Sequence, residues 1–338
     1  MARRTAAPRR QRGLSLIELM ISMAIGLFLL AGLVGVFVNS SQSSAELSKS
    51  AQQIENGRFA IQSIVDDLAH AGYYGYYTAP TAPGSLQDPC AVTAAAIKDA
   101  LGNAVQAYNK PSAPPSPLDA CLPAANHLPN SDILVVRRVD SNETTGSNFE
   151  VGRLYLQANA NPDDAGNPLL ASASAADGPL STFTLKKKDN SAAVARKMHV
   201  HIYFLSPCSL PLTCTGGAGD DAIPTLKRLE LTASGFQVVP IAEGIEDLQF
   251  DYGVDADADG APETPFIESP AATADWANVV AVQVSLLARN VESTPGYTDT
   301  KTYNLGAFKA VTPRGAYKRH AYTGLVRIVN VSARRETP

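Results

Sequence analysis

The feature that most constrains this chain is an apolar run of 25 residues, from Leu14 to Val38, with a single charged residue, Glu18. At 1.5 Å per residue a helix of that length measures about 37 Å, enough to cross a bilayer with some tilt. Residues 1–13 hold five arginines and no acidic residue. Because positive charge stays on the cytoplasmic side, we expect a cytoplasmic N-terminus, a membrane helix and a body outside the cytoplasm.

Charge and composition narrow the possibilities for that body. The net charge is −4, but without residues 1–13 the chain has 23 basic against 32 acidic residues. An acidic body argues against a dedicated nucleic-acid-binding protein, which would carry a basic surface. Hydrophobic residues make up 45% of the chain, which is enough for a substantial core. We therefore expect a folded domain and no nucleic-acid partner.

Two residues distinguish the run from a plain anchor or an uncleaved secretory signal. A secretory signal is cleaved after its apolar stretch, at small residues, whereas Gly13 lies before the stretch. A carboxylate at the centre of a membrane segment costs about 2.5–3.5 kcal/mol on insertion scales. Glu18 lies near the cytoplasmic end, where the cost is lower, but it still requires a functional partner.

The segment RGLSLIELMISMAIG, residues 12–26, resembles the type III signal of type IV prepilins. The resemblance implies that a prepilin peptidase cleaves between Gly13 and Leu14 and methylates the new amine of Leu14. It also implies that Glu18 pairs with the terminal amine of a neighbouring subunit, so that neither charge is buried alone in a filament. Leu14 departs from the phenylalanine that is most common at this position in the family.

Beyond Val38 the chain continues without proline into an amphipathic segment. Its apolar residues recur at steps of three and four: Leu47, Ala51, Ile54, Ile61, Val65 and Leu68. We expect one helix from about Leu14 to Ala71, ended by Gly72. The serine-rich residues 40–44 are expected to form a flexible junction between its halves.

The end of this helix carries a second resemblance, to the PilW family of minor pilins. The matching residues are Arg58, Phe59, Asp67, Leu68, Ala71, Gly72 and Tyr73. The later segments GIEDLQFDYGV, WANVVAVQVSLLARN and YTGLVRIVNVSARR extend it over nearly the whole chain. They also resemble the related J-type minor pseudopilins of type II secretion.

The rest of the chain predicts an α+β fold, with the long helix packed on an antiparallel β-sheet domain. Residues 73–130 are rich in Pro, Ala and Ser and predict a surface excursion with a short helix near Ala91–Leu101. The expected strands are Asp132–Val139, Val151–Ala158, Phe183–Lys188, Lys197–Leu205, Thr225–Thr232, Gly235–Pro240, Ile245–Tyr252, Val279–Ala288, Lys301–Leu305 and Gly324–Val331. The expected organisation is leader peptide 1–13, membrane and filament-core helix 14–38, amphipathic continuation 39–72, excursion 73–130 and β-rich domain 131–338.

Four cysteines are expected to form disulfides, because cysteines outside the cytoplasm normally pair. Three pairings are possible, and proximity in the sequence favours Cys90–Cys121 and Cys208–Cys214. Zinc is the alternative, but the sequence has no CxxC pair or adjacent histidine cluster to support it.

Three aspartates in DADADG, Asp255, Asp257 and Asp259, resemble the opening of an EF-hand calcium loop. The frame then fails, because Phe266 occupies the position of the bidentate glutamate, although Glu263 and Glu268 are close. A solvated acidic turn is the alternative. Calcium is the only cofactor that the sequence suggests.

Two further groups have simpler explanations than a ligand site. His199 and His201 lie on one face of a predicted strand, where exposed positions explain them better than a metal. Lys186–Lys188 is expected to be a solvated strand end, with DNA contact as the alternative. The sequence holds no GxSxG, Walker loop, dinucleotide fingerprint or HExxH motif, so we do not expect an enzyme.

The resemblance implies a minor pilin of the inner membrane, with a periplasmic body, that takes part in starting and assembling a type IV pilus within a tip complex. The implied partners are prepilin peptidase, other minor pilins, the major pilin, the inner-membrane assembly platform and a large tip adhesin. A J-type minor pseudopilin is the nearest alternative, because its N-terminal chemistry is the same. A membrane-anchored binding protein or adhesin is an alternative of another class, and it predicts an uncut Gly13 and a dispensable Glu18.

Overall fold

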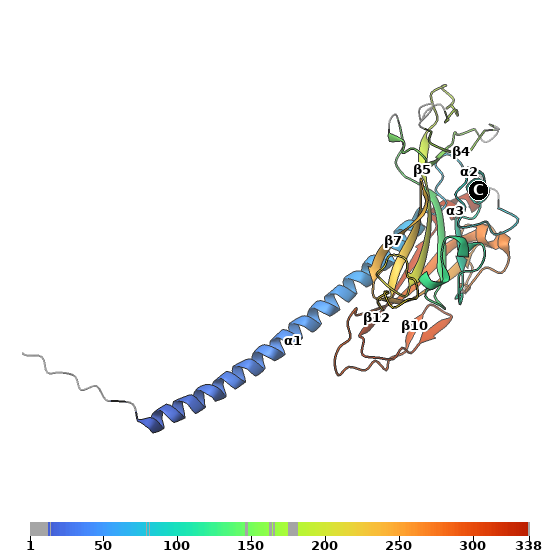
Figure 1. Ribbon diagram of the computed structural model, residues 1–338. Coiled ribbons are helices and arrows are strands. Elements are labelled where there is room, and N and C mark those ends of the chain that lie inside the picture. Colours follow the sequence, from blue (N-terminus) through green and yellow to red (C-terminus); the bar gives the residue numbers. More distant parts are fainter. Residues whose placement is uncertain are drawn as a thin grey trace, which may run out of the picture. The chain divides into compact units, whose positions relative to one another are not determined.

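A computed structural model describes residues 13, 15–78, 80, 82–145, 148–161, 164, 166–174 and 182–336 (Figure 1). The chain divides into two compact units, Met1–Ser50 and Ala51–Pro338. The first unit contains the N-terminal part of helix α1 (Leu16–Ala69), and the second contains the rest of α1 and the strands.

Helix α1 is 54 residues long and close to the predicted bounds. It continues without a break through residues 40–44, so the predicted flexible junction is wrong. Serine lowers helix stability by only a few tenths of a kcal/mol relative to alanine, and neither glycine nor proline interrupts this stretch. Gly72 adopts a φ of 72°, and its amide donates to the carbonyl of Arg137 at 2.9 Å. The predicted stop of the helix is confirmed.

The larger sheet of the second unit has seven antiparallel strands. They are β1 (Val105–Tyr108), β2 (Ile133–Val139), β3 (Leu154–Gln157), β4 (Leu169–Ser172), β5 (Ala195–Ser206), β6 (Thr225–Thr232) and β7 (Gly235–Glu243). Five strands follow the order β1-β2-β5-β3-β4, while β6 joins β5 to β7. The 12-residue β5 pairs with β2, β3 and β6, which makes it the central strand.

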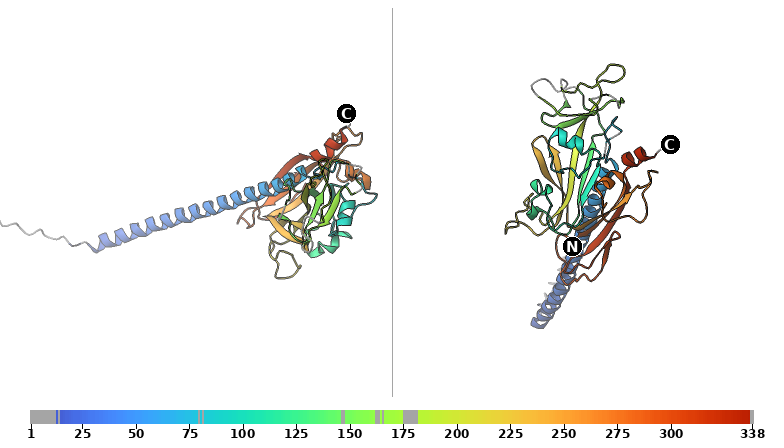
Figure 2. Two further views of the ribbon diagram at one scale, coloured as in Figure 1. Left: turned by 90° about the horizontal axis from the view of Figure 1, so that it is seen from above. Right: turned by 90° about the vertical axis from the view of Figure 1, so that its right-hand side faces the viewer.

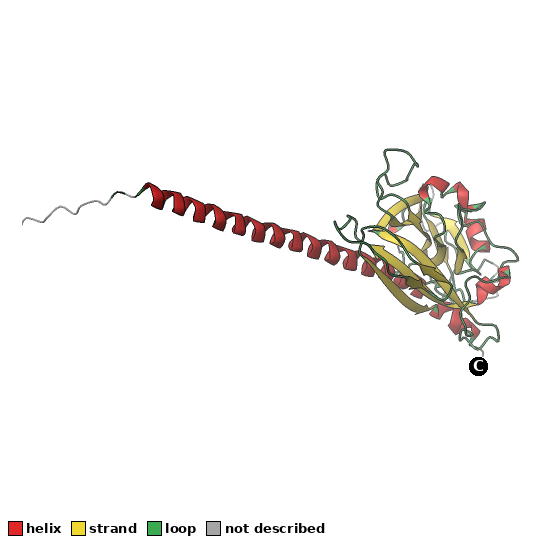
Figure 3. Ribbon diagram, turned by 90° about the horizontal axis from the view of Figure 1, so that it is seen from below, coloured by secondary structure: helices red, strands yellow, loops and turns green. Residues whose placement is uncertain are grey.

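The smaller sheet has the strand order β12-β9-β8. Its strands are β8 (Ile245–Val254), β9 (Val279–Arg289) and β12 (Arg319–Arg327). A separate hairpin joins β10 (Tyr303–Leu305) to β11 (Lys309–Val311). The remaining helices are short (Figure 3): α2 (Ala94–Asp99), η1 (Leu118–Ala120), η2 (Ala124–Asn126), η4 (Thr273–Asn278) and α3 (Val329–Arg335).

The main core lies between the second part of α1 and both sheets (Figure 2). Ala60, Ile64 and Leu68 of α1 are fully buried there. On the smaller sheet, Gly57 lies so close to Tyr322 of β12 that a Cβ would approach its ring to 2.3 Å. Glycine at this position therefore allows the helix to approach the strand closely.

The predicted α+β fold is confirmed, with three local corrections. Phe183–Lys188 is not a strand and makes only one bridge, from Lys186 to Ala192. The last predicted strand ends at Arg327, and the residues after it form α3, because the buried Ile328 and Val331 are three residues apart, a spacing that places them on one helix face.

The predicted surface excursion, residues 73–130, is partly core. It contributes strand β1 and a second hydrophobic cluster on the other face of the larger sheet. Ile97, Leu118 and Leu122 are buried there against β2 and β5. The composition of residues 73–130 did not predict their burial, because the large buried residues occur singly and far apart among prolines and alanines.

Candidate functional site

The N-terminal part of α1 is long and apolar enough to cross a membrane. Its most apolar 18-residue window has a mean hydropathy of 2.5, and none of the window, all within the described residues, is buried. A bare apolar helix is stable in lipid or against other apolar helices, because its backbone groups are already paired. This segment therefore needs one of those two environments.

Glu18 lies in the first turn of α1, and its carboxylate accepts a hydrogen bond from the amide of Ser15 at 2.9 Å. A negative charge in the first turn is favourable, because it faces the positive end of the helix dipole. Gly13 is exposed, and a Cβ there would meet nothing within 4 Å. Leu14 lies outside the described residues, so cleavage, methylation and the pairing of Glu18 with an amine stay predictions.

The second part of α1 presents an exposed apolar face on the surface of unit 2. Ile54 and Phe59 are its large apolar residues, with Phe59 57% exposed. Together with Ala51, Glu55, Arg58, Ile61 and Gln62 they line a shallow, open groove. Single exposed apolar side chains are ordinary, whereas neighbouring ones such as these can mark an interaction site.

The opposite face of α1 carries a buried carboxylate, Asp67, in the last turn of the helix. Its Oδ1 accepts from Arg138 Nε of β2 at 2.6 Å, and its Oδ2 accepts from His201 Nδ1 of β5 at 2.7 Å. The hydroxyl of Tyr203 donates to Oδ2 at 3.0 Å, and Arg228 of β6 donates to that hydroxyl at 3.0 Å. Burial alone would raise the pKa of Asp67, but His201 and Arg138 outweigh it and hold the pKa well below its usual range. The helix end is thus fastened to three strands.

This role of Asp67 was not predicted. The sequence does contain a local indication of it, because Asp67 falls between Ile64 and Leu68 on the buried side of the helix. A negative charge in the last turn is also unfavourable beside the negative end of the helix dipole, so it needs a partner. His201 is buried, so the prediction of an exposed strand position is wrong for it. His199 lies next to it with ring centroids 5.4 Å apart, and burial, His201 and Arg138 lower the pKa of His199 to about 4.

Both disulfides join the cysteines that sequence proximity favoured. Cys90 pairs with Cys121 across 31 residues, and Cys208 pairs with Cys214 across six. The first links the start of the excursion to η1 and so fastens the second core cluster. The second closes a small loop that follows β5.

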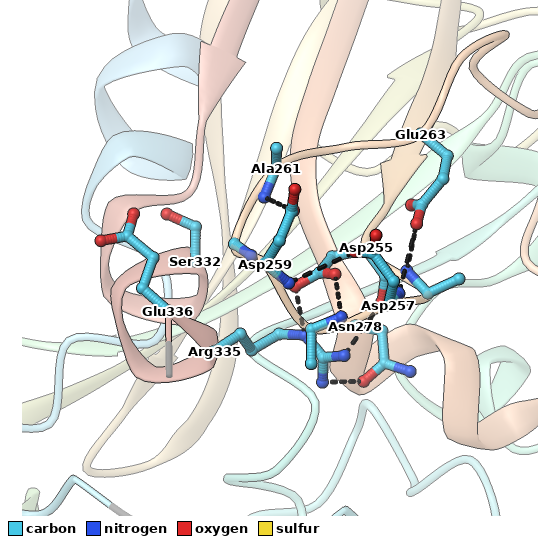
Figure 4. A network of polar contacts seen from close by, with 12 residues as sticks. Asp255, Asp257, Asp259, Ala261, Glu263, Asn278, Ser332, Arg335 and Glu336 are labelled. Carbon is cyan, nitrogen blue, oxygen red and sulfur yellow. Dashed lines mark hydrogen bonds and ion pairs between the residues drawn. The ribbon is translucent and has the colours of Figure 1, made fainter. Parts of the chain in front are cut away.

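Asp255, the first aspartate of DADADG, fastens the C-terminal helix α3 (Figure 4). Asp255 is buried, and its Oδ2 accepts from Arg335 Nε at 2.6 Å. Arg335 Nη1 donates to Asn278 Oδ1 at 2.5 Å. Burial would raise the pKa of Asp255, but the hydrogen bond and charge of Arg335 lower it below its usual value. A guanidinium therefore already neutralises the first aspartate of the motif.

A calcium ion would find three carboxylates in this loop, but not the predicted set. Asp255, Asp257 and Glu263 each offer an oxygen within 4.8 Å of the others. Asp259 instead accepts from the amide of Ala261 at 2.7 Å. Because Arg335 holds Asp255, calcium would have to share that carboxylate or displace the arginine, and calcium binding stays a prediction.

Comparison with protein families gives two matches. Residues 8–34 match the prokaryotic N-terminal methylation motif, and residues 214–330 match the type IV pilus-assembly protein W family, PilW. No curated protein and no solved structure matches the chain. The predicted resemblance to prepilins is confirmed at the signal, and the predicted resemblance to PilW is confirmed over residues 214–330, which include all of β6 to β12. The helix-end residues 58–73 lie outside the PilW match. The chain therefore carries a PilW-family domain behind an N-terminal methylation motif, which is consistent with a type IV minor pilin made as a prepilin.

Proposed function

We propose that this chain is a non-catalytic minor pilin that takes part in starting and assembling the type IV pilus, within a complex at the pilus tip. The observation that carries the proposal is the unburied apolar part of α1, with Glu18 as its only charge, directly behind Gly13. Such a helix can move from lipid to a filament of similar helices without exposing its apolar face to water. The PilW match supports the pilus as that filament.

Processing and topology belong to the same proposal. Prepilin peptidase cleaves between Gly13 and Leu14 and methylates Leu14, and the arginines before Gly13 keep that end in the cytoplasm. Glu18 then pairs with the Leu14 amine of a neighbouring subunit, which avoids burying either charge alone. The exposed position of Gly13 supports access by a peptidase.

The tip position rests on the body of the protein. The second unit spans 288 residues with long loops, and a body of that size fits better at one end of a filament than repeated along its shaft. Other minor pilins, the major pilin, the assembly platform and a large tip adhesin are the expected partners. Even distribution along sheared filaments, at the abundance of the major subunit, would contradict the tip position.

The test is the amount of surface pilin released by shearing from a deletion strain. We expect pili to be lost, to return with the wild-type gene, and to stay absent with Gly13→Val or Glu18→Ala. Gly84→Val and Glu46→Ala are matched controls, since Gly84 has open space around it and Glu46 forms a partly exposed ion pair with Lys49 on the same helix. Both controls should restore pili.

Other outcomes would point to the alternatives. Normal pili together with a failure to export secreted enzymes would indicate a J-type pseudopilin. An uncut Gly13 and a harmless Glu18→Ala substitution would indicate a membrane-anchored binding protein or adhesin.

A further inference from the structure

The loop between β5 and β6 exposes two leucines at its tip. Leu210 is 63% exposed and Leu212 is 49% exposed, and Pro211 between them is also exposed. Single apolar residues on a surface are ordinary. This pair is different because the backbone beneath it is unusually well fastened.

A disulfide and a carboxylate hold the backbone of the loop in place. The Cys208–Cys214 disulfide closes it directly beneath the leucines. The carboxylate of Asp221 accepts from the amides of Ser209 at 2.7 Å and Leu210 at 2.9 Å. The first residues of the loop, Cys208 to Leu210, are therefore fixed by the disulfide and by Asp221.

A buried lysine also holds the loop. The ammonium group of Lys227, on β6, is enclosed by the protein and donates to the carbonyls of Leu212 at 2.8 Å and Pro211 at 3.3 Å. Burying an ammonium group is costly unless its donors are satisfied. Two hydrogen bonds of the Lys227 ammonium group go to the backbone of the loop tip, so the lysine orders the tip. A loop ordered in advance loses little conformational entropy when it binds.

The loop lies next to the part of α1 that enters the second unit. The Ser209 hydroxyl donates to Glu243 Oε1 at 2.6 Å. The carbonyl of Glu243, at the end of β7, accepts from Asn56 of α1 at 3.1 Å. The exposed leucines therefore stand at the margin of unit 2 where its α1 segment begins.

The surroundings of the tip favour a protein over a lipid surface. Asp220, Asp221 and Glu243 flank the loop, and an acidic rim is repelled by anionic lipid headgroups. Burial would raise the pKa of Asp220 and Asp221, but backbone amides that donate to them lower it, so both stay charged at neutral pH. An apolar partner that also carries cations would fit.

We propose that the Cys208–Cys214 loop docks, through Leu210 and Leu212, on the α1 helix of a neighbouring pilin subunit. This inference rests on the proposed function, because helices of neighbouring subunits run beside this end of α1 only in a helix-cored filament. A helix presents apolar side chains one turn apart, roughly 5–6 Å, on one face, which gives each of two neighbouring leucines a partner. The chain's own α1 shows the required chemistry, since Arg58 lies beside Ile54 and Phe59.

Site-specific photocrosslinking in piliated cells tests the contact. The full-length chain carries a benzophenone amino acid at Leu212, or at Phe308 as a control that is 47% exposed in the β10–β11 turn. We expect irradiation at position 212 to give an adduct that maps to the α1 segment of another pilin, and none of this adduct from position 308. Adducts only with lipid or with non-pilin proteins, or no adduct in normally piliated cells, would overturn the inference.

A double substitution, Leu210→Ser with Leu212→Ser, tests its consequence. We expect at least a tenfold loss of sheared pilin with normal protein level and an intact disulfide, and no loss for Phe308→Ser. If deletion of the gene abolishes pili while the double variant forms them normally, the docking inference fails and the proposed function stands. If deletion leaves pili normal, the proposed function fails, and the crosslinking result alone decides the docking.

Discussion

Asp67 is a single residue whose surroundings make a quantitative prediction. Its carboxylate joins Arg138 and His201, and removing it leaves the buried His201 and the half-buried Arg138 without their shared partner. Breaking a buried ion pair by removing one partner typically costs about 3–5 kcal/mol. We expect Asp67→Ala to lower the free energy of unfolding by that amount, measured by denaturant titration of the full chain in detergent.

The neighbouring carboxylate provides the control for this experiment. Asp66 lies one residue earlier and contacts only Gln62 and solvent among the described contacts of its side chain. We expect Asp66→Ala to change the stability by no more than about 0.5 kcal/mol. Equal effects of the two substitutions would show that Asp67 does not fasten the helix.

His199 predicts how stability depends on pH. Its pKa in the folded chain is about 4, because burial, His201 and Arg138 disfavour the charged form. The unfolded chain takes up this proton near pH 6.5, so stability is complete above that pH and falls as the pH drops toward 4. The loss is at most about 3 kcal/mol. Urea titrations across this range should show the fall, His199→Gln should reduce it, and exposed His320→Gln should not.

The two histidines also show what the sequence could not provide. His199 and His201 point to the same face of β5 as Tyr203, and that face is covered by α1. Alternation along a strand separates its two faces and suggests that one of them is exposed. Both faces of β5 are covered by hydrophobic cores, so the alternation could not show that the histidines are covered. The contact of His201 with Asp67 joins residues 134 positions apart, a separation over which no local pattern carries information.

At the scale of elements, the ion pair between Arg335 and Asp255 joins α3 to the aspartate loop. Arg335→Gln removes the cation from this pair and leaves the Asp255 carboxylate buried. We expect faster hydrogen exchange of residues 329–335 and a free energy of unfolding lower by about 1–3 kcal/mol. Arg314→Gln is the control, because Arg314 is exposed.

The same loop decides the calcium prediction. If calcium binds at Asp255, Asp257 and Glu263, the wild-type melting temperature should rise with calcium, and Arg335→Gln should bind calcium more tightly because the competing cation is gone. If calcium has no effect on either protein, the resemblance to an EF-hand loop has no functional meaning, and the motif serves to dock α3.

The excursion predicts a different element-scale effect. Because Ile97, Leu118 and Leu122 complete a core, opening the Cys90–Cys121 bridge should loosen more than a surface loop. Replacing both cysteines with serine is expected to cost about 3–4 kcal/mol for a loop of this length. A change below about 1 kcal/mol, measured by unfolding under oxidising conditions, would show that the excursion is not part of the cooperative fold.

At the scale of the whole molecule, the exposed face of α1 predicts an effect on assembly without one on stability. Phe59 is 57% exposed, so Phe59→Ser should leave the unfolding free energy within about 0.5 kcal/mol of wild type. If this face binds another subunit, sheared pilin should fall severalfold. Phe308→Ser, with similar exposure, should leave both quantities unchanged, and equal piliation of the two variants would exclude the face from the interface.

The long helix was predictable because it combines an uninterrupted apolar run, a regular stripe and a terminal glycine, all of which are local signals. The antiparallel strands were predictable for the same reason. Strand β1, the helical end at α3 and the fastening of Asp67 were not, because each depends on a partner far away in the chain.

One helix serves both as the apolar segment and as a core element of unit 2, and this has a mechanical consequence. Tension applied along α1 enters unit 2 along the whole packed length of the helix. Near the start of this length Gln53 donates to the carbonyls of Ala288 and Lys318, and in the last turn Asp67 is held by side chains from β2 and β5. Contacts that lie across the direction of pulling share the load, whereas a strand peeled from an edge loses its contacts one at a time. A filament that is extended and withdrawn under force would thus distribute the pull over both sheets instead of loading a single strand.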